Sequence, residues 1–368
     1  EPPSIFDVIK ENEFMVHHPY HSFDLSTQRF IEEAAADPKV LAIKQTLYRT
    51  SKDSPLMHSL MRAAEAGKQV AVLVEIKARF DEEQNIQWAQ QLDTYGVHVA
   101  YGIPGLKIHT KLTMVVREEE AGLKTYCHIG TGNYHPGTAQ LYEDLGLFTC
   151  DETIAEDVTD IFNLLTGYAP DQTFNKLMVA PKHMRKQMEA YIKFETEEAK
   201  EGRPSRIIAK MNSLEDPVII QLLYEASEAG VQVDLIVRGV CRLIPGKEGL
   251  SENIRVYSVI GRFLEHSRIF YFHHAGEHVY ALGSADWMHR NLDNRVEAII
   301  KVERPEFKKY LQFLISIYMQ DNQQRWELYS NGEYKKIERN KGDRKISTHK
   351  VLMNHMADVA EPIAISPS

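Results

Sequence analysis

The sequence predicts an α/β protein built from two tandem copies of one unit, each a mixed, mostly parallel sheet flanked by helices. The length of 368 residues suits two domains of ordinary size. The chain also contains an internal repeat, because residues 64–79 read AEAGKQVAVLVEIKAR and residues 227–242 read SEAGVQVDLIVRGVCR. In both copies a helical pattern leads through a glycine into an apolar run. We interpret the two halves as products of an internal duplication.

The predicted helix of each copy begins and ends with the same signals. Pro55 and Pro217 follow Ser and Asp, and proline is favoured in the first helical turn. Apolar residues then recur at helical spacing. Gly67 and Gly230 come next, where a left-handed C-cap favours glycine.

Strands are predicted on both sides of each helix. Residues 40–49 (VLAIKQTLYR) and 206–212 (RIIAKMN) precede the helices, and apolar runs at 70–76 and 233–237 follow them. A strand, a helix and a second strand in this order imply parallel pairing with a covering helix. Each half therefore begins as a β-α-β unit.

A hairpin is predicted later in each half. Residues 108–116 and 125–133 flank a polar turn in the first half, and residues 266–274 and 277–285 do so in the second. Residues 182–205 have a charged helical pattern that ends with Gly and Pro.

We expect the domain boundary near residue 175, which gives domains at 1–175 and 176–368. The stretch after residue 330 is rich in Lys, Arg and Asn, and it predicts a surface helix followed by a frayed tail.

Composition limits the classes of function. The formal net charge of −9 argues against a general nucleic-acid binder, but an anionic substrate can still occupy a locally basic cleft. Cys127, Cys150 and Cys241 show neither a disulfide framework nor zinc spacing, which predicts a cytoplasmic protein. No membrane span or signal peptide is predicted, so membrane association has no support in the sequence. The chain begins at Glu1, as a fragment of a longer protein would.

Four arginines follow predicted strands, at the sheet edge where α/β proteins bind ligands. Arg49 and Arg79 lie in the first half, and Arg238 and Arg242 lie in the second. Guanidinium groups bind phosphate in a bidentate manner, so the four predict a shared anion site. The alternative for each arginine is a helix cap or a surface ion pair.

Each half also has a histidine followed two residues later by a basic residue. His109 and Lys111 lie in a predicted strand and share one face, and His266 and Arg268 occupy the corresponding hairpin. Imidazole is nucleophilic at neutral pH and can carry a phosphoryl group, while a second imidazole can act as general acid or base. His109 and His266 are therefore the candidate catalytic residues.

Two further patterns carry weaker information. The turns at 130–133 (GTGN) and 283–286 (GSAD) can expose backbone N–H groups to anions. His17, His18 and His21 could form a metal cluster, but an extended segment is favoured because no carboxylate or cysteine lies beside them. The sequence has no Walker A motif, protein-kinase catalytic loop or dinucleotide fingerprint.

The paired motifs resemble the phospholipase D superfamily, in which each of two halves has H-x-K, a later Asp and a Gly-Ser-x-Asn turn. His109 and Lys111 match the first element. Val116 stands in place of the Asp, Arg268 replaces the second Lys, and Asp286 replaces an Asn. These departures argue against a phosphodiesterase, which remains an alternative function.

A closer resemblance, to the polyphosphate kinase family, covers the chain from residue 17 to about residue 330. The matching segments are LAIKQTLYRTSKDSP, VEIKARFDEEQNIQWA, GLKIHTKL, HIGTGNYHPGTAQLYED, VRGVCRLIPG, LEHSRIFYF and SADWMHRNLDNRVE. They resemble the two C-terminal catalytic domains of that family, which are phospholipase D-like, without the domains that usually precede them. The resemblance implies reversible transfer of the γ-phosphate of ATP to a polyphosphate chain, through a phosphohistidine and with Mg²⁺.

The resemblance also implies roles for individual residues. His109 resembles the histidine that becomes phosphorylated, and His266 the second active-site histidine that also contacts nucleotide. Tyr142 and Arg238 match ATP-binding positions.

Arg49 and Arg79 match the arginines associated with the magnesium site. Arginine has no lone pair for a metal, so we expect these two to hold the phosphates that carry Mg²⁺. The further residues expected to contact phosphate are Lys107, Lys111, Asn133, Arg242 and Arg268. ATP, ADP and polyphosphate are the expected partners, together with further copies of the chain in a homo-oligomer. A non-catalytic polyanion-binding fragment is the remaining alternative.

Overall fold

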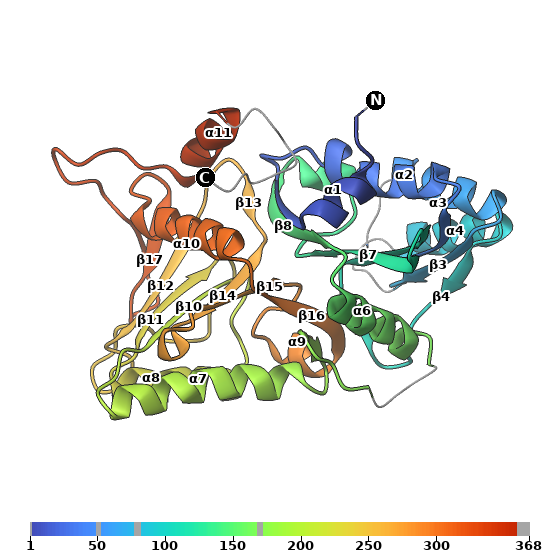
Figure 1. Cartoon of the computed structure of the whole chain (residues 1–368). Coiled ribbons are helices and arrows are strands. Elements are labelled where there is room, and N and C mark those ends of the chain that lie inside the picture. Colours follow the sequence, from blue (N-terminus) through green and yellow to red (C-terminus); the bar gives the residue numbers. More distant parts are fainter. Residues whose placement is uncertain (1, 49–52, 77–81, 168–171, 359–368) are drawn as a thin grey trace.

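The structure is a computed structural model that describes residues 2–48, 53–76, 82–167 and 172–358. Two mixed sheets lie side by side, one mainly from each half of the chain (Figure 1). The predicted α/β class with two mixed sheets is therefore confirmed.

The first sheet has eight strands. In spatial order they are β1 (Phe14–His18), β8 (Tyr142–Thr149), β7 (Gly122–Gly130), β6 (Leu112–Glu119), β2 (Val40–Leu47), β3 (Gln69–Val74) and β4 (His98–Ala100), with β13 (Leu264–Glu265) beside β8.

The second sheet has ten strands. In spatial order they are β18 (Tyr334–Lys336), β17 (Arg325–Leu328), β12 (Ile254–Val259), β11 (Gln232–Val237), β10 (Arg206–Met211), β14 (Arg268–Phe272), β15 (Val279–Gly283), β16 (Arg295–Val302) and β5 (Lys107–Ile108), with β9 (Leu177–Ala180) also beside β16.

Helices cover both sheets. In the first half they are α1 (Ile5–Glu11), α2 (Arg29–Ala36), α3 (Pro55–Glu65), α4 (Glu82–Thr94), α5 (Pro136–Ala139) and α6 (Glu152–Leu165), with a π-turn η1 (Asp24–Gln28). In the second half they are α7 (Met184–Lys200), α8 (Pro217–Ala229), α9 (His289–Asp293), α10 (Pro305–Gln320) and α11 (Thr348–Asp358), with a 3-10 turn η2 (His274–Gly276). Helices α7 and α8 lie on one side of the second sheet, and α10 and α11 lie on the other (Figure 1).

The predicted helix signals of the repeat are confirmed. Helix α3 begins at Pro55 and α8 begins at Pro217. The side chain of Asp216 caps α8 by accepting a hydrogen bond from the N–H of Ile219. Gly67 and Gly230 adopt φ angles of 86° and 103°, which L-residues with a Cβ rarely adopt.

The strand pairing confirms one prediction and corrects another. Strand β2 pairs in parallel with β3, and β10 with β11, as each β-α-β unit predicts. However, β2 and β10 also pair with the hairpin strands β6 and β14, and those pairs are antiparallel. Among the described strands antiparallel pairs outnumber parallel pairs in both sheets. The expectation of mostly parallel sheets is therefore wrong, because the hairpin strands pair in antiparallel fashion with their neighbours and strands such as β1, β9 and β17 add further antiparallel pairs.

The halves exchange short strands at the predicted catalytic histidines. Strand β5 pairs with β16 of the second half, whereas the chain continues directly into β6 of the first sheet. Strand β13 pairs with β8 of the first half before the chain enters β14 of the second sheet. His109 and His266 lie at these two junctions, so their predicted location within continuous strands is wrong.

The hydrophobic core joins the halves. One buried cluster contains Ile108 and Phe162 from the first half together with Val296 and Leu314 from the second. The predicted C-terminal surface helix exists as α11, but it is docked against the protein, since Leu352 is fully buried. In the described part of the chain, no helix is both long and apolar enough to cross a membrane.

Candidate active site

His109 lies at the junction between the two sheets and is held by a carboxylate from the other half. The Nδ1–H of His109 donates to Glu297 on β16, at 2.7 Å from Oε1. Both side chains are buried, and Glu297 is fully inaccessible to solvent. Because Nδ1 is engaged, Nε2 is the ring nitrogen left to react with a substrate.

Neutral donors hold the far side of the Glu297 carboxylate. The hydroxyl of Ser284 donates to Oε2, and the amide of Asn291 donates to Oε1 at 2.8 Å. Burial raises the pKa of Glu297, and the nearby Lys111 ammonium opposes this only in part. The position of the His109 ring is therefore fixed by a hydrogen-bonded chain from the second domain.

His266 repeats this arrangement with the halves exchanged. Its Nδ1–H lies 2.8 Å from Oδ1 of Asp144, which is on β8 of the first half. Thr131 donates a second hydrogen bond to the same carboxylate, at 2.6 Å. Burial would raise the pKa of Asp144, but His266, Thr131 and Arg268 outweigh it and leave the pKa lowered. Each candidate histidine is thus positioned by the half of the chain that does not contain it.

Three cations, of which Lys111 and Arg268 are buried and Arg295 is partly buried, lie close enough to His109 to affect its charge. Burial lowers its pKa well below the usual value, and Lys111, Arg295 and Arg268 lower it further, in that order. Lys111 is itself buried, which lowers its pKa to about 7, and its ammonium group donates to the carbonyl of His109. A neutral imidazole facing positive charge suits nucleophilic attack on a phosphate.

Arg268 connects the two halves beside His266. Its guanidinium donates to the carbonyl of Thr131 in the first half at 3.2 Å, and Nη1 lies 3.4 Å from Nε2 of His266. Asp286 accepts a hydrogen bond from Nε of the same arginine at 3.1 Å. Burial and then Arg268 lower the pKa of His266, while Asp144 opposes the change.

The structure brings Tyr142 and Arg238 to the same site. The ring of Tyr142 lies 5.4 Å from the ring of His266, measured between centroids. Arg238 donates to Oδ1 of Asn212 through Nε at 3.0 Å and through Nη2 at 2.7 Å. Burial and the neighbouring Arg268 lower the pKa of Arg238, so its charge lies close to the other cations of the site.

The remaining expected phosphate contacts are less closely grouped. Lys107 is exposed on β5 and is paired in register with Arg295. Asn133 follows β7 beside Asp144, and its Oδ1 is buried without a hydrogen-bond partner among the described residues. Arg242 is exposed, and within the described ranges no hydrogen bond joins its side chain to His109 or His266.

The two arginines expected at a magnesium site, Arg49 and Arg79, lie outside the described residues. Among the described residues of the site, the carboxylates of Asp144, Glu297 and Asp286 already accept hydrogen bonds from histidine, arginine or neutral donors. Mg²⁺ prefers several oxygen ligands in octahedral geometry. The described donor set therefore does not fit a magnesium ion held by protein side chains alone.

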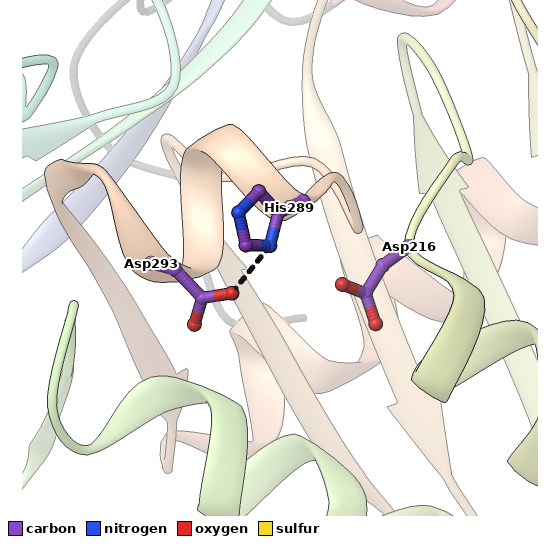
Figure 2. Close-up of side chains that lie close together, drawn as sticks. All are labelled: Asp216, His289 and Asp293. Carbon is purple, nitrogen blue, oxygen red and sulfur yellow. Dashed lines mark ion pairs between the residues drawn. The ribbon is translucent and has the colours of Figure 1, made fainter.

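A second candidate cluster, away from the histidines, contains Asp216, His289 and Asp293 (Figure 2). His289 pairs with Asp293 at 2.7 Å. The guanidinium of Arg185 occupies both carboxylates, donating to Asp216 at 2.7 Å and to Asp293 at 2.6 Å. We interpret the cluster as an ion-pair network that fastens α7 to the start of α8 and to α9.

The N-terminal histidines form structural contacts, as the extended-segment interpretation predicts. His17 and His18 lie in β1. Nδ1 of His21 accepts the backbone N–H of His17 at 2.8 Å, and His18 contacts the carbonyl of His21 at 2.9 Å. Burial lowers the pKa of His21 to about 3.

A buried ionic network lies directly beneath the His266 pair. Lys210 on β10 contacts Glu143 at 3.3 Å, Glu265 at 3.2 Å and the hydroxyl of Ser267 at 2.8 Å. His349 of α11 contacts the other oxygen of Glu265 at 2.7 Å. Glu143 precedes Asp144 in the chain and Glu265 precedes His266, so the network supports both members of that pair.

Sequence reasoning missed Glu297, Asp144 and Arg295. The internal repeat contained a signal for the two acids, because Asp144 follows Gly130 at the same spacing at which Glu297 follows Gly283. Arg295 had no equivalent in the first half, where Tyr142 stands at the corresponding position.

Comparisons with known proteins assign the chain to one family. Residues 4–171 match the family model described as polyphosphate kinase C-terminal domain 1, and residues 177–348 match polyphosphate kinase C-terminal domain 2. The chain is 56% identical to a polyphosphate kinase of Thermosynechococcus vestitus over 95% of the chain and 48% of that protein. It is 58% identical to one of Synechocystis over 90% of the chain and 45% of that protein. The chain thus spans about half the length of the curated relatives it matches.

Solved structures extend the comparison to the fold. The polyphosphate kinase of Porphyromonas gingivalis superposes with a TM-score of 0.90 at 33% identity, covering 98% of this chain and 55% of that one. A phosphatidylserine synthase of Haemophilus influenzae superposes with a TM-score of 0.57 at 12% identity, covering 95% and 93% of the two chains. The second likeness concerns the fold alone. The α/β class with two halves of similar architecture, predicted from the sequence, agrees with these superpositions.

Proposed function

The chain belongs to the polyphosphate kinase family, of which it contains C-terminal domains 1 and 2, and from this premise we propose that it transfers the γ-phosphate of ATP reversibly to the end of a polyphosphate chain. The observation that carries the proposal is His109, a buried imidazole with a lowered pKa that is fixed by Glu297 and lies near the cations Lys111, Arg295 and Arg268.

The proposed reaction has two transfer steps. In the first, Nε2 of His109 attacks the γ-phosphorus, the N–P bond forms, the bond from phosphorus to the bridging oxygen breaks, and ADP leaves with that electron pair. In the second, an oxygen of the terminal phosphate of the polymer attacks the same phosphorus and the N–P bond breaks. Glu297 accepts the hydrogen bond from Nδ1–H throughout, which stabilises the positive charge on the ring.

The cations stabilise the transferring phosphoryl group. We assign this role to Lys111 and Arg268, with Arg295 beside them, because phosphoryl transfer depends mainly on positioning and on the stabilisation of negative charge. Mg²⁺ enters, in our proposal, bound to the phosphates of ATP as part of the substrate. It neutralises part of their charge there.

The second histidine faces the nucleotide. We propose that His266, with Tyr142 and Arg238, holds ATP and that His266 acts as general acid or base. Contacts to the polymer come from Lys107, Lys111, Asn133, Arg242 and Arg268. Arg49 and Arg79 hold the phosphates that carry Mg²⁺.

Three further properties belong to the same proposal. The domain boundary lies near residue 175, between domains at 1–175 and 176–368. The free cysteines Cys127, Cys150 and Cys241 suit the reducing cytoplasm. The functional protein is a homo-oligomer.

Labelling with γ-labelled ATP and Mg²⁺ tests the proposal. We expect an acid-labile, base-stable label on the wild-type chain and none on His109→Ala. The control is His58→Ala, which removes an exposed histidine of α3 and should leave the label unchanged. Label that persists in His109→Ala moves the nucleophile to another residue, with His266 the next candidate.

The alternatives predict other outcomes. A phosphodiesterase would hydrolyse a diester without ATP or metal. A non-catalytic polyanion binder would bind polyphosphate equally well in wild type and His109→Ala, with no label on either, and that result would refute the proposed transfer.

A further inference from the structure

Residues 335–345, which begin within β18 and end just before α11, form an exposed segment of opposite charge to the rest of the chain. This segment, the basic arm, reads KKIERNKGDRK and has six Lys or Arg and two Asp or Glu among its residues, whereas the whole chain carries −9. Every charged side chain of the arm is exposed. Figure 1 shows it projecting from the second domain and returning to α11.

Two of the arm's six cations make contacts within the arm and its neighbouring turn, and the other four make no ion pair in the described ranges. Lys335 lies over the ring of Tyr329 at 4.9 Å, and Arg339 donates to the carbonyl of Asp343. In the described ranges of the chain, Lys336, Lys341, Arg344 and Lys345 make no ion pair with any carboxylate. Their charge is therefore available to an external anion.

Backbone contacts fix the arm at both ends. Strand β18 pairs with β17, and the N–H of Ile337 donates to the carbonyl of Arg325 at 2.9 Å. At the other end, Asn322 donates to the carbonyl of Arg344 at 2.9 Å and accepts the N–H of Ile346 at 2.9 Å. A fixed row of cations loses less conformational freedom on binding than a free tail does.

The arm also leads toward the active site. Helix α11 begins at Thr348, and the next residue, His349, contacts Glu265 at 2.7 Å. Glu265 directly precedes the catalytic His266 in the chain. Lys345 lies four residues before His349, a distance that an extended chain spans in at most about 14 Å.

We propose that the basic arm is a second binding surface for inorganic polyphosphate, which holds the part of the polymer that extends beyond the active site. This inference rests on the proposed function, because it assigns the arm to the same polymer. A chain of net negative charge repels a polyanion, so a local row of unpaired cations supplies the attraction that the overall charge opposes. The polymer fits because it presents one negative charge after another along a flexible backbone.

The test compares two phosphate probes on the 368-residue chain. Tripolyphosphate is short enough to occupy the active site alone, whereas a long polyphosphate also reaches the arm. In the arm variant, Lys341→Gln, Arg344→Gln and Lys345→Gln are combined. The control variant combines Lys186→Gln, Lys193→Gln and Lys301→Gln, which makes the same charge change at exposed lysines elsewhere in the second domain.

We expect the arm variant to bind long polyphosphate about tenfold more weakly than wild type, because three exposed cations no longer face the polymer. The dependence of affinity on salt should also fall, by roughly 0.7 for each phosphate that the arm no longer neutralises. Binding of tripolyphosphate should stay unchanged, and the control variant should match wild type on both probes.

Other outcomes overturn the inference. Equal weakening in the arm and control variants would mean that net charge alone is responsible. If the arm variant binds both long polyphosphate and tripolyphosphate as wild type does, the arm is not a polyphosphate-binding surface. The proposed function is not affected by that result. A wild-type chain that binds neither probe contradicts both. Loss of binding only to vesicles of anionic lipid would assign the arm to a membrane surface instead.

Discussion

The two candidate catalytic histidines, His109 and His266, occupy equivalent junctions, but their carboxylate partners lie in different surroundings. Glu297, the partner of His109, is held by the neutral donors Ser284 and Asn291, and burial raises its pKa. Asp144, the partner of His266, lies beside Arg268 and has a lowered pKa. The duplication thus kept the geometry of the pair while its electrostatics diverged.

The difference indicates a division of roles. Burial and the nearby cations, led by Lys111, hold the pKa of His109 well below its usual value, so its ring is neutral and suits a nucleophile. Asp144 has a lowered pKa, and its charge opposes the lowering of the His266 pKa by burial. Two histidines with separated proton affinities suit a nucleophile and an acid–base partner.

The largest expected effect is on the rate at which ATP labels His109, when each carboxylate partner is replaced in turn by its neutral amide. In Glu297→Gln the amide can donate to Nδ1 and force the proton onto Nε2, which blocks the nucleophile. We expect labelling of His109 by ATP to slow by roughly 10²–10⁴-fold. Rapid-quench measurement of label formation checks this.

Asp144→Asn is the matched variant at the other pair. It should slow labelling far less, and it should change the pH dependence of multiple-turnover transfer. Equal slowing of the labelling step in both variants would break the comparison, because neither histidine would then be distinguished as the nucleophile.

The second prediction concerns the network beneath the His266 pair. Burial opposes ionisation of Glu143, but Lys210 and His17 outweigh it and hold its pKa well below the usual range. Burial and the charge of Glu143 raise the pKa of Glu265. Glu143→Gln therefore leaves Lys210 without its main counter-charge and should reduce the free energy of unfolding by about 3–5 kcal/mol. Glu265→Gln should cost about 1 kcal/mol or less.

Denaturant unfolding at several pH values tests this contrast. A lowered folded-state pKa contributes stability that is present above the unfolded value and is lost as pH falls, so Glu143 stabilises the protein at neutral pH. A raised folded-state pKa has the opposite sign, so Glu265 costs stability as pH rises above its unfolded value. If Glu265→Gln is the more damaging change, the two carboxylates have been assigned the wrong way round.

Local patterns predicted the parts of the fold that local forces determine. The helices starting at Pro55 and Pro217, the glycine at each helix end and the first parallel pair of each half were all available from the sequence. The exchange of β5 and β13 was not, because two residues carry no periodic signal and their partners lie in the other half. The alternation of polar and apolar residues also continues where the chain leaves one sheet and enters the other, so it does not mark the exchange.

The residues of the candidate site likewise divide into those that the sequence predicted and those that it did not. The repeat singled out His109 and His266, and the structure brings Tyr142, Arg238 and Arg268 to them. The carboxylate partners were missed because each lies in the half of the chain that does not contain its histidine. Sequence patterns within one half indicate only partners that are close in sequence. Packing of the two halves, which the sequence pattern does not specify, creates the site.

The smallest expected effect is on the KM for polyphosphate, and it distinguishes Lys111 beside His109 from Arg268 beside His266. Lys111 beside His109 has a pKa of about 7, whereas Arg268 beside His266 keeps its charge at every accessible pH. As pH rises through 7, Lys111 loses its proton and its attraction for phosphate, so the KM for polyphosphate should rise several-fold by about pH 9. Lys111→Arg cannot lose its charge in this range, and its KM should stay nearly constant. Lys193→Arg, at an exposed lysine of α7, is the control and should follow the wild-type profile. If KM rises equally in Lys111→Arg and wild type, a group other than Lys111 causes the weaker polyphosphate binding at high pH. Lys111 and Arg268 would then not differ in the way that the comparison requires.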